Sequence, residues 1–426
     1  MNLTPGLQGG HQLRLLRGGE ALFPALHAAI RGAVHEVWLA SYIVHTDAAS
    51  AQLADALAAA ARRGVRVRLL VDGFGSRHAI AWWRERLADS PVALAVFRPL
   101  ESWWQWLQPG QLRRLHLKLC VVDGAQAFVG GINVIDDRLD LNHGPLDAPR
   151  LDFAVGFEGP AVAQVDAQLR RLWARSWLGR DFGDELRLLL DASHPLTQLR
   201  GWFGSQWLRF RGAYGRAQER RRERLAAEAD DTPVRLAYVR RDNLRNRHAI
   251  EREYLRALRG ARQRFELICP YFYPSARLLR ALLNAARRGV EVRLLLQGQF
   301  DYRIADWAAR ALYEQLLDKG VRIFEYRAAF LHAKVALADE DWATLGSSNL
   351  DPTSLLLNLE ANVVVSDARF VADLRQEFLQ ASAGAVEVQR EAPQPGWRGW
   401  RGWLRRGVVA WLAQVYLRAA GGGSLY

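Results

Sequence analysis

The pattern of apolar and polar residues predicts an α/β unit in the first part of the chain. A stretch rich in alanine and leucine runs up to Arg62 and Arg63 and stops at Gly64, the residue type favoured just after a helix. The next residues, 65–70, are mostly valine and leucine, as expected for a buried strand. A helix that leads through a short turn into a hydrophobic strand is an α/β unit.

This pattern occurs twice. Residues 60–70 recur as residues 285–295, an offset of 225. A second stretch, His-Leu-Lys-Leu-Cys-Val-Val-Asp at 116–123, recurs as His-Ala-Lys-Val-Ala-Leu-Ala-Asp at 332–339, an offset of 216. The two offsets fit a duplicated unit with a net gap of nine residues between the copies. We therefore place one lobe at residues 10–200 and the other at residues 233–385.

Two basic segments lie outside these lobes. In the linker, residues 201–232, the early arginines are interleaved with aromatic residues, which fits a basic helix. The plainer alternative is a solvated helix that only joins the lobes. In the tail, residues 386–426, Trp397, Trp400 and Trp403 alternate with arginines, and apolar residues then fall on one helix face. That pattern is typical of an amphipathic anchor at a membrane surface, and packing against the protein core is the alternative.

Composition narrows the class of protein. Of 426 residues, 50% are apolar and 24% are charged, which excludes a largely disordered chain, a collagen and a coiled coil. Two cysteines are too few for a disulfide scaffold or a four-cysteine zinc site. No secretory signal and no apolar run long enough for a membrane span is visible, so a cytosol-facing protein is expected.

The charge of the chain indicates an anionic partner. A net charge of +13 attracts nucleic acid, an anionic membrane surface or a phosphate-rich substrate. Sixteen tryptophans fit a membrane interface or stacking on bases, so they leave the partner open. Only three of the 58 basic residues are lysines, and Lys118 and Lys334 both lie in the repeated motif. A lysine kept in so arginine-rich a chain indicates a need for a compact ammonium.

The repeated motif places a histidine and a lysine on the same side of a strand. Residues i and i+2 of a strand point to one face, so His116 converges with Lys118, and His332 with Lys334. An imidazole can attack phosphorus or transfer protons, while an ammonium can hold phosphate oxygens. The duplicated pairs therefore predict phosphate chemistry.

Two further pairs of residues complete each copy. The glycine-containing turns after the motifs end in Asn133 and Asn349, whose amides can donate to phosphate oxygens. Asp152 and Glu360 occupy equivalent places where a strand begins downstream of each histidine. A reacting histidine needs an acceptor at its second ring nitrogen, so these carboxylates are candidates to orient the histidines. The alternative is that both are surface strand residues.

These motifs resemble those of the phospholipase D superfamily, in which two His-Lys-Asp motifs form one active site. The resemblance covers most of residues 11–385 and is greatest to bacterial cardiolipin synthases of the B-type branch, which lacks the N-terminal membrane spans of the A-type. Segments outside the motifs that carry it are residues 72–76, 241–243, 270–274, 294–298, 346–352 and 358–362. Ala40-Ser41-Tyr42 departs from the Glu-Thr-Phe-like stretch that is frequent there. The resemblance implies an α/β fold of two duplicated lobes, each a mixed sheet flanked by helices, with the active site at their interface.

The family also implies a mechanism, one that needs no metal and no cofactor because lysines supply the cations. One motif histidine attacks the phosphodiester of a phospholipid and forms a phosphatidyl-histidine intermediate. In the family's usual order this is His116, while His332 protonates the leaving alcohol and then deprotonates the acceptor. The motif lysines and the turn asparagines would hold the phosphoryl oxygens. Asp123 and Asp339 complete the catalytic motifs, although their odd spacing from the lysines puts them on the opposite strand face.

The resemblance implies a phosphatidyltransferase that joins phosphatidylglycerol to phosphatidylglycerol or to phosphatidylethanolamine, giving cardiolipin. A hydrolase that releases phosphatidic acid has the same motifs, because acceptor choice depends on water exclusion and pocket shape. A superfamily nuclease is the alternative from another substrate class. The tryptophans of the tail and of residues 103–106 favour lipid, and no nucleic-acid partner is expected. We expect a peripheral protein on the cytoplasmic face of the bacterial inner membrane, bound to its anionic surface.

Overall fold

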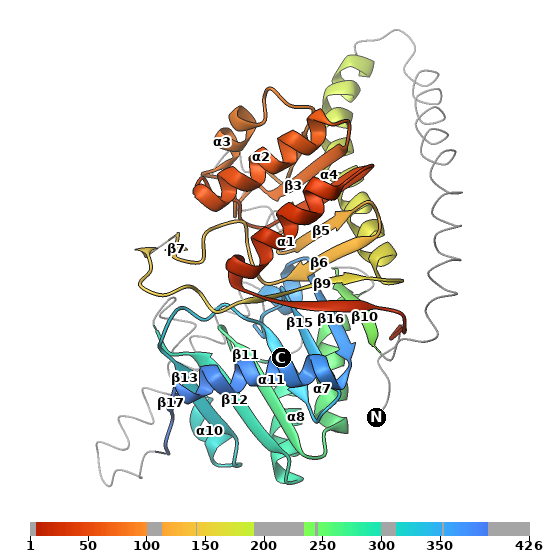
Figure 1. The fold of residues 1–426 in the computed structure, drawn as a ribbon. Helices are drawn as coiled ribbons and strands as arrows, with labels where there is room; N and C mark the ends of the chain where they lie inside the picture. The colour runs from red at the N-terminus through yellow and green to blue at the C-terminus, as the bar shows by residue number, and fades with distance from the viewer. Residues whose placement is uncertain are drawn as a thin grey trace.

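The computed structural model describes residues 6–99, 113–141, 143–190, 234–242, 246–299, 312–351 and 353–390. Within these ranges the strands form a seven-stranded sheet, an eight-stranded sheet and a two-stranded ribbon (Figure 1). The predicted linker, the tryptophans of residues 103–106 and residues 391–426 of the predicted tail lie outside the described residues. No helix in the described ranges is long and apolar enough to cross a membrane.

The two large sheets have the same strand order, as expected for a duplicated chain. In spatial order, the first sheet contains β1 (Gln12–Arg17), β9 (Phe153–Glu158), β6 (Gln126–Gly130), β5 (Lys118–Val122), β2 (Glu36–Ser41), β3 (Arg66–Asp72) and β4 (Ala93–Phe97). The second contains β10 (Arg235–Arg241), β16 (Glu360–Ser366), β15 (Trp342–Gly346), β14 (Val335–Ala338), β11 (Arg264–Cys269), β12 (Glu291–Gln297), β13 (Arg322–Tyr326) and β17 (Val386–Glu387). Parallel pairs join β2, β3 and β4, and likewise β11, β12 and β13, while the other pairs are antiparallel. The predicted mixed sheets are thus confirmed.

Helices pack on both faces of each sheet. The outer helices of the first lobe are α1 (Gly18–Gly32), α2 (Ala48–Arg62) and α3 (Ile80–Arg86), and those of the second are α7 (Ala249–Gly260), α8 (Ala276–Arg287) and α10 (Tyr313–Leu317). Two more helices, α4 (Val162–Leu190) and α11 (Ala368–Ala383), contribute to the core between the sheets. The ribbon of β7 (Leu139–Asp140) and β8 (Gly144–Pro145) projects at the level where the lobes meet (Figure 1).

The predicted helix–glycine–strand unit is present in both lobes. Gly64 follows α2 with φ +94°, and Gly289 follows α8 with φ +88°. Glycine adopts this left-handed conformation at little cost, which is why it ends each helix. In both lobes the backbone amide of the residue after the glycine donates to a carbonyl of the helix. In the first lobe, Val65 N donates to Ala60 O at 3.2 Å. The matching caps explain why this stretch of sequence repeats so clearly.

One hydrophobic core runs through the interface between the lobes. It contains Val129 and Val155 of the first sheet together with Leu345 and Val363 of the second, each no more than 1% exposed. Two isolated parallel bridges also cross the interface, joining residue 115 to residue 359 and residue 151 to residue 331. Separation of the lobes would therefore expose apolar surface and break backbone hydrogen bonds. The motif histidines lie beside these two bridges.

Candidate active site

The two predicted His–Lys pairs lie at equivalent places, and the structure brings them together. His116 lies just ahead of β5, whose first residue is Lys118, and Lys334 lies directly before β14. Lys118 is 6% exposed and Lys334 is 1% exposed. The positive charges of both lysines act on the imidazoles of both His116 and His332 and lower their pKa values, after burial as the larger cause. The site is therefore single, buried and shared by the lobes.

Each histidine is held by a carboxylate of the other lobe. His116 Nδ1 lies 3.0 Å from Glu360 Oε2, and His332 Nδ1 lies 2.6 Å from Asp152 Oδ2. Asp152 is 2% exposed and Glu360 is fully buried, so neither is a surface strand residue. An imidazole that donates its Nδ1–H to a carboxylate keeps Nε2 for the substrate. Both carboxylates thus occupy the predicted orienting position, and the pairing crosses the interface.

The backbone fixes the same crossed arrangement. His116 N donates to Leu359 O at 3.1 Å, and Leu359 directly precedes Glu360. In the other half, His332 N donates to Leu151 O at 2.9 Å. Each histidine is therefore attached at two points to the strand start of the opposite lobe, which restricts both its position and its ring orientation.

The lysine ammonium groups face the histidine segments. Lys118 Nζ donates to His116 O at 3.1 Å, and Lys334 Nζ donates to His332 O. Burial and the neighbouring charge of Lys334 lower the pKa of Lys118 to about 7, and burial lowers that of Lys334 to about 8. An anionic phosphodiester between them would favour the charged form of both. Two cations that repel each other at close range are well suited to a shared anion.

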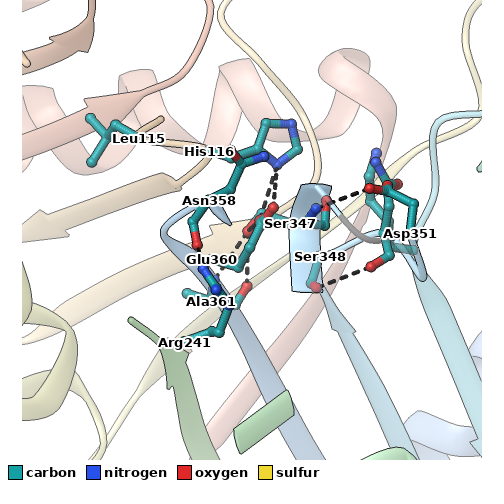
Figure 2. Close-up of polar contacts among 12 residues, drawn as sticks. Leu115, His116, Arg241, Ser347, Ser348, Asp351, Asn358, Glu360 and Ala361 are labelled. Carbon is teal, nitrogen blue, oxygen red and sulfur yellow. Dashed lines mark hydrogen bonds and ion pairs between the residues drawn. The ribbon is translucent and has the colours of Figure 1, made fainter. Parts of the chain in front are cut away.

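Behind Glu360 lies a second layer of polar residues, shown in Figure 2. Ser347 Oγ donates to Glu360 Oε2 at 2.5 Å. Arg241, which is 1% exposed, pairs directly with Glu360 in the register of β10 and β16. Its guanidinium donates to Leu355 O at 3.1 Å and to Asn358 O. Glu360 thus lies between His116 and a buried cation.

The first lobe has different residues at the equivalent places. Gly131 takes the place of Ser347, and a Cβ there would lie 2.3 Å from Asp152 Oδ1. Gly18 lies opposite Asp152, because Gly18 N donates to Asp152 O at 2.9 Å. A Cβ on Gly18 would lie 2.7 Å from Asp137 Oδ2, so Asp137 fills that space. Burial raises the pKa of Asp152 to about 7, and the charge of Asp137 acts in the same direction.

The two turn asparagines are buried. Asn133 is 4% exposed and lines a small cavity of about 30 Å³ together with Lys118. Its Oδ1 accepts from Ile43 N at 3.3 Å, so the oxygen of this amide is engaged by the backbone. Asn349 is 6% exposed, and its Oδ1 has no hydrogen-bond partner within the described ranges.

The motif aspartates lie at the far ends of their strands. Asp123 accepts hydrogen bonds from the backbone amides of residues 34–36, and Asp339 accepts from those of residues 262–264. Both have left-handed backbones, with φ +51° and +46°. Both are predicted among the catalytic residues, and in the structure their carboxylates bind backbone amides. Each joins the end of the motif strand to the start of the neighbouring strand, β2 or β11.

Tyr42 belongs to the site and was not among the predicted residues. Its ring centroid lies 4.8 Å from that of His116 in an edge-on contact, and Lys118 Nζ lies 5.3 Å from its centroid. β2 pairs with β5 so that Ser41 lies opposite Lys118, and Tyr42 directly follows. The sequence signal for Tyr42 was that residues 40–42 depart from the family pattern. That departure does not show that Tyr42 contacts the histidine and the lysine.

Comparisons with known proteins agree with the motifs. A family model described as "Cardiolipin synthase, PLD-like domain" matches residues 26–146 and 254–381. Cardiolipin synthase B of Escherichia coli (strain K12) is 36% identical over 369 residues, which cover 87% of this chain and 80% of that protein. Cardiolipin synthase A of Pseudomonas entomophila (strain L48) is 31% identical over 372 residues, 87% and 68% of the two chains. A crystal structure of phosphatidylserine synthase from Haemophilus influenzae Rd KW20 matches with a TM-score of 0.63 at 13% identity, covering 95% and 94%, and supports the fold alone.

Proposed function

We propose a function that starts from one fact: this chain belongs to the family of phospholipase D-like cardiolipin synthases. It is a phosphatidyltransferase, and the predicted likeness to the B-type branch is confirmed. The reaction that we propose joins two phosphatidylglycerol molecules into cardiolipin and releases glycerol. The observation that carries this proposal is the crossed pair of histidine–carboxylate contacts beside two buried lysines.

In the proposed first step, His116 Nε2 attacks the phosphorus of the donor lipid. The P–O bond to the head-group glycerol breaks, and His332 gives the proton on its Nε2 to the leaving oxygen. In the second step, the acceptor hydroxyl gives its proton to His332 and attacks phosphorus, and the P–N bond to His116 breaks. Two phosphatidylglycerol molecules thus yield one cardiolipin and one glycerol, and both histidines return to their starting states. The choice of His116 as nucleophile follows the family's usual order.

The remaining site residues have supporting roles in this scheme. Lys118 and Lys334 hold the non-bridging phosphoryl oxygens, because they are buried cations on either side of the interface. Asn133 and Asn349 add neutral donors to the same oxygens. Charge that develops on phosphorus oxygens is stabilised most where water is excluded, as it is around these buried side chains.

The test is mass spectrometry of the lipid products. Purified protein is mixed with phosphatidylglycerol alone, and then with phosphatidylethanolamine added, beside a His116→Ala control. Cardiolipin that forms from phosphatidylglycerol alone and disappears in the control is the expected result. Phosphatidic acid as the only product would replace the transferase by a hydrolase. Absence of any lipid product would contradict the substrate class.

We also propose that the protein binds the anionic surface of the cytoplasmic face of the inner membrane peripherally. The net charge of +13 and the basic, tryptophan-rich tail support this. The expected result is that the protein floats with anionic liposomes and that removal of residues 396–426 abolishes flotation. Equal flotation of the truncated protein would assign the attachment to another surface.

A further inference from the structure

The two histidine–carboxylate pairs are alike in their contacts but differ in the charge behind the carboxylate. We propose that Arg241 and Asp137 are positioning residues that divide the work between the histidines, Arg241 keeping His116 as the nucleophile and Asp137 keeping His332 as the acid. This inference rests on the proposed function. It replaces an order taken from the family by a cause that lies in this chain.

The cation in the second lobe follows from strand register. Arg241 and Glu360 are directly opposite each other in an antiparallel pair, so their side chains share one face of the sheet. The guanidinium is anchored to Leu355 O and Asn358 O, which keeps it in place behind the carboxylate. Its charge and that of Glu360 act on each other, and Ser347 adds a hydroxyl donor to the carboxylate. Glu360 therefore lies beside a buried cation and a hydroxyl donor.

The anion in the first lobe follows from the missing side chain of Gly18. Because Gly18 lies opposite Asp152, it occupies the position that Arg241 occupies in the second lobe. Its backbone has φ +64°, which favours glycine, and the carboxylate of Asp137 lies in the free space. Asp137 is 8% exposed and accepts a hydrogen bond from Gly19 N. A negative charge therefore stands where the other lobe has a positive one.

The sign of the effect follows from proton counting. A neutral imidazole whose Nδ1–H is donated to a carboxylate forms a pair with one negative charge, and a second proton at Nε2 makes the pair neutral. A nearby cation opposes uptake of that second proton, whereas a nearby anion favours it. Arg241, through Glu360, thus keeps a free Nε2 on His116 for attack. Asp137, through Asp152, favours the proton on His332 that the leaving group needs.

The other charges around the two pairs do not cancel this difference. Lys118 and Lys334 act on both pairs. Arg150 opposes protonation of His332, but its guanidinium is paired with Asp140 at 3.1 Å. Burial raises the pKa of Asp137 itself, and Asp136 and Glu20 act in the same direction, whereas the hydrogen bond from Gly19 N and the charge of Arg150 favour its anionic form. Burial raises the pKa of Asp152 and the charge of Asp137 acts in the same direction, which favours the protonated form of this pair.

The experiment is the pH dependence of kcat/KM for glycerol release from phosphatidylglycerol in mixed micelles with a non-ionic detergent. Glycerol release is the first step of both transfer and hydrolysis, so the readout does not depend on the acceptor. In the proposed scheme activity falls at low pH when His116 takes up its second proton, and at high pH when His332 loses its own.

Two variants should move opposite limbs of the profile. Arg241→Gln removes the cation, raises the pKa of the His116 pair and moves the acidic limb upward by about one pH unit, leaving the alkaline limb unchanged. Asp137→Asn removes the anion, lowers the pKa of the His332 pair and moves the alkaline limb downward by about one unit. Arg240→Gln on the same strand and the exposed Asp147→Asn are matched controls and should shift neither limb.

The outcomes separate the inference from the proposed function. A loss of kcat/KM with both limbs unmoved would give Arg241 and Asp137 a structural part only and overturn the inference. If instead Arg241→Gln moved the alkaline limb and Asp137→Asn moved the acidic limb, the histidines would have exchanged roles, which also overturns the inference. If Arg241→Gln does not fold, Asp137→Asn still tests the acid half. A wild-type protein that releases no glycerol at all would contradict the proposed function instead.

Discussion

Lys118 is one of three lysines in the chain, and its ammonium is buried between the two lobes. The Nζ atom donates to His116 O, and the side chain is only 6% exposed, so there is little room for a wider group. We expect Lys118→Arg to lower kcat/KM at least about 100-fold, because a planar guanidinium cannot take the place of a compact ammonium. Cardiolipin formation under initial-rate conditions measures this.

Lys319→Arg is the matched control for that substitution. Lys319 is exposed at the end of α10 and should tolerate arginine without loss of turnover. Near-normal turnover of Lys118→Arg would refute the requirement for an ammonium at that position.

The crossed contacts predict which histidine responds to which carboxylate. Glu360→Gln should change the ¹⁵N chemical shifts of the His116 ring and leave those of His332 nearly unchanged, because His116 is the one of these two histidines whose ring is hydrogen-bonded to Glu360. Asp152→Asn should do the reverse. Selective labelling of the ten histidines, with assignment by His→Ala variants, makes the comparison possible. A shift of the His332 ring in Glu360→Gln, or of the His116 ring in Asp152→Asn, would contradict the crossed pairing.

The residues of the site differ in how far the sequence could reveal them. The histidines, lysines and turn asparagines repeat in both halves, so duplication alone singled them out. Arg241 was noticed only through the family resemblance, because its counterpart in the other half is a glycine and leaves no repeat. No sequence pattern pointed to Asp137, because its carboxylate occupies the space left by the missing side chain of Gly18. A search for repeats finds only residues that both halves share, so it misses residues at which the halves differ.

The strands that carry the motifs are fastened by their aspartates. Asp123 accepts from the amides of Val34, His35 and Glu36, which lead into β2. We expect Asp123→Ala to lower the free energy of unfolding by about 2–3 kcal/mol, because it removes hydrogen bonds to a charged acceptor. The midpoint of urea unfolding measures this, and the exposed Asp89→Ala is the control.

The stabilisation by Asp123 also depends on pH. Burial raises the pKa of its carboxyl, but the hydrogen bonds from the three amides outweigh this, and the net shift is downward. A group whose pKa is lower in the folded state stabilises the fold above its unfolded pKa, and this contribution is lost as the pH falls through the folded value. The stability difference between wild type and Asp123→Ala should therefore narrow below about pH 4. A difference that stays constant down to pH 2 would contradict this reading.

Local elements were predictable where their causes are local. The pattern at residues 60–70 follows from spacing and from a left-handed glycine, so the sequence revealed the helix, glycine and strand that span residues 48–72. The sequence also indicated that Asp123 points away from the lysine face, but not that it binds the loop before β2. That contact joins residues about 90 apart and depends on the neighbouring strand in the sheet.

The whole active site is expected to come from one chain. Both crossed pairs and the shared core lie within a single copy, so the His116→Ala and His332→Ala variants each lack a part that the other cannot supply. Mixing the two inactive proteins should restore no cardiolipin synthesis. Recovery toward a quarter or a half of wild-type turnover would show that lobes exchange between chains. Co-expression of the two variants tests the same point during folding.

The arrangement of the lobes was the part that the sequence left to the family resemblance. The duplication predicted two similar units, but nothing in their patterns fixed which faces meet. The structure places β6 and β9 of one lobe against β15 and β16 of the other, with Val129, Val155 and Val363 in a common core. This contact brings Asp152 to His332 and Glu360 to His116.

The crossed contacts have a consequence for the ancestry of the chain. A single lobe holds a histidine whose carboxylate partner is on the other lobe, so an ancestor with one lobe would have worked only as a two-fold dimer with two identical pairs. Duplication within one gene removed that identity and allowed each pair to change on its own. The halves now differ at two pairs of equivalent positions behind the carboxylates: Arg241 and Gly18, and Ser347 and Gly131. In descendants, compensating substitutions should link positions in opposite halves of the sequence more strongly than positions within one half.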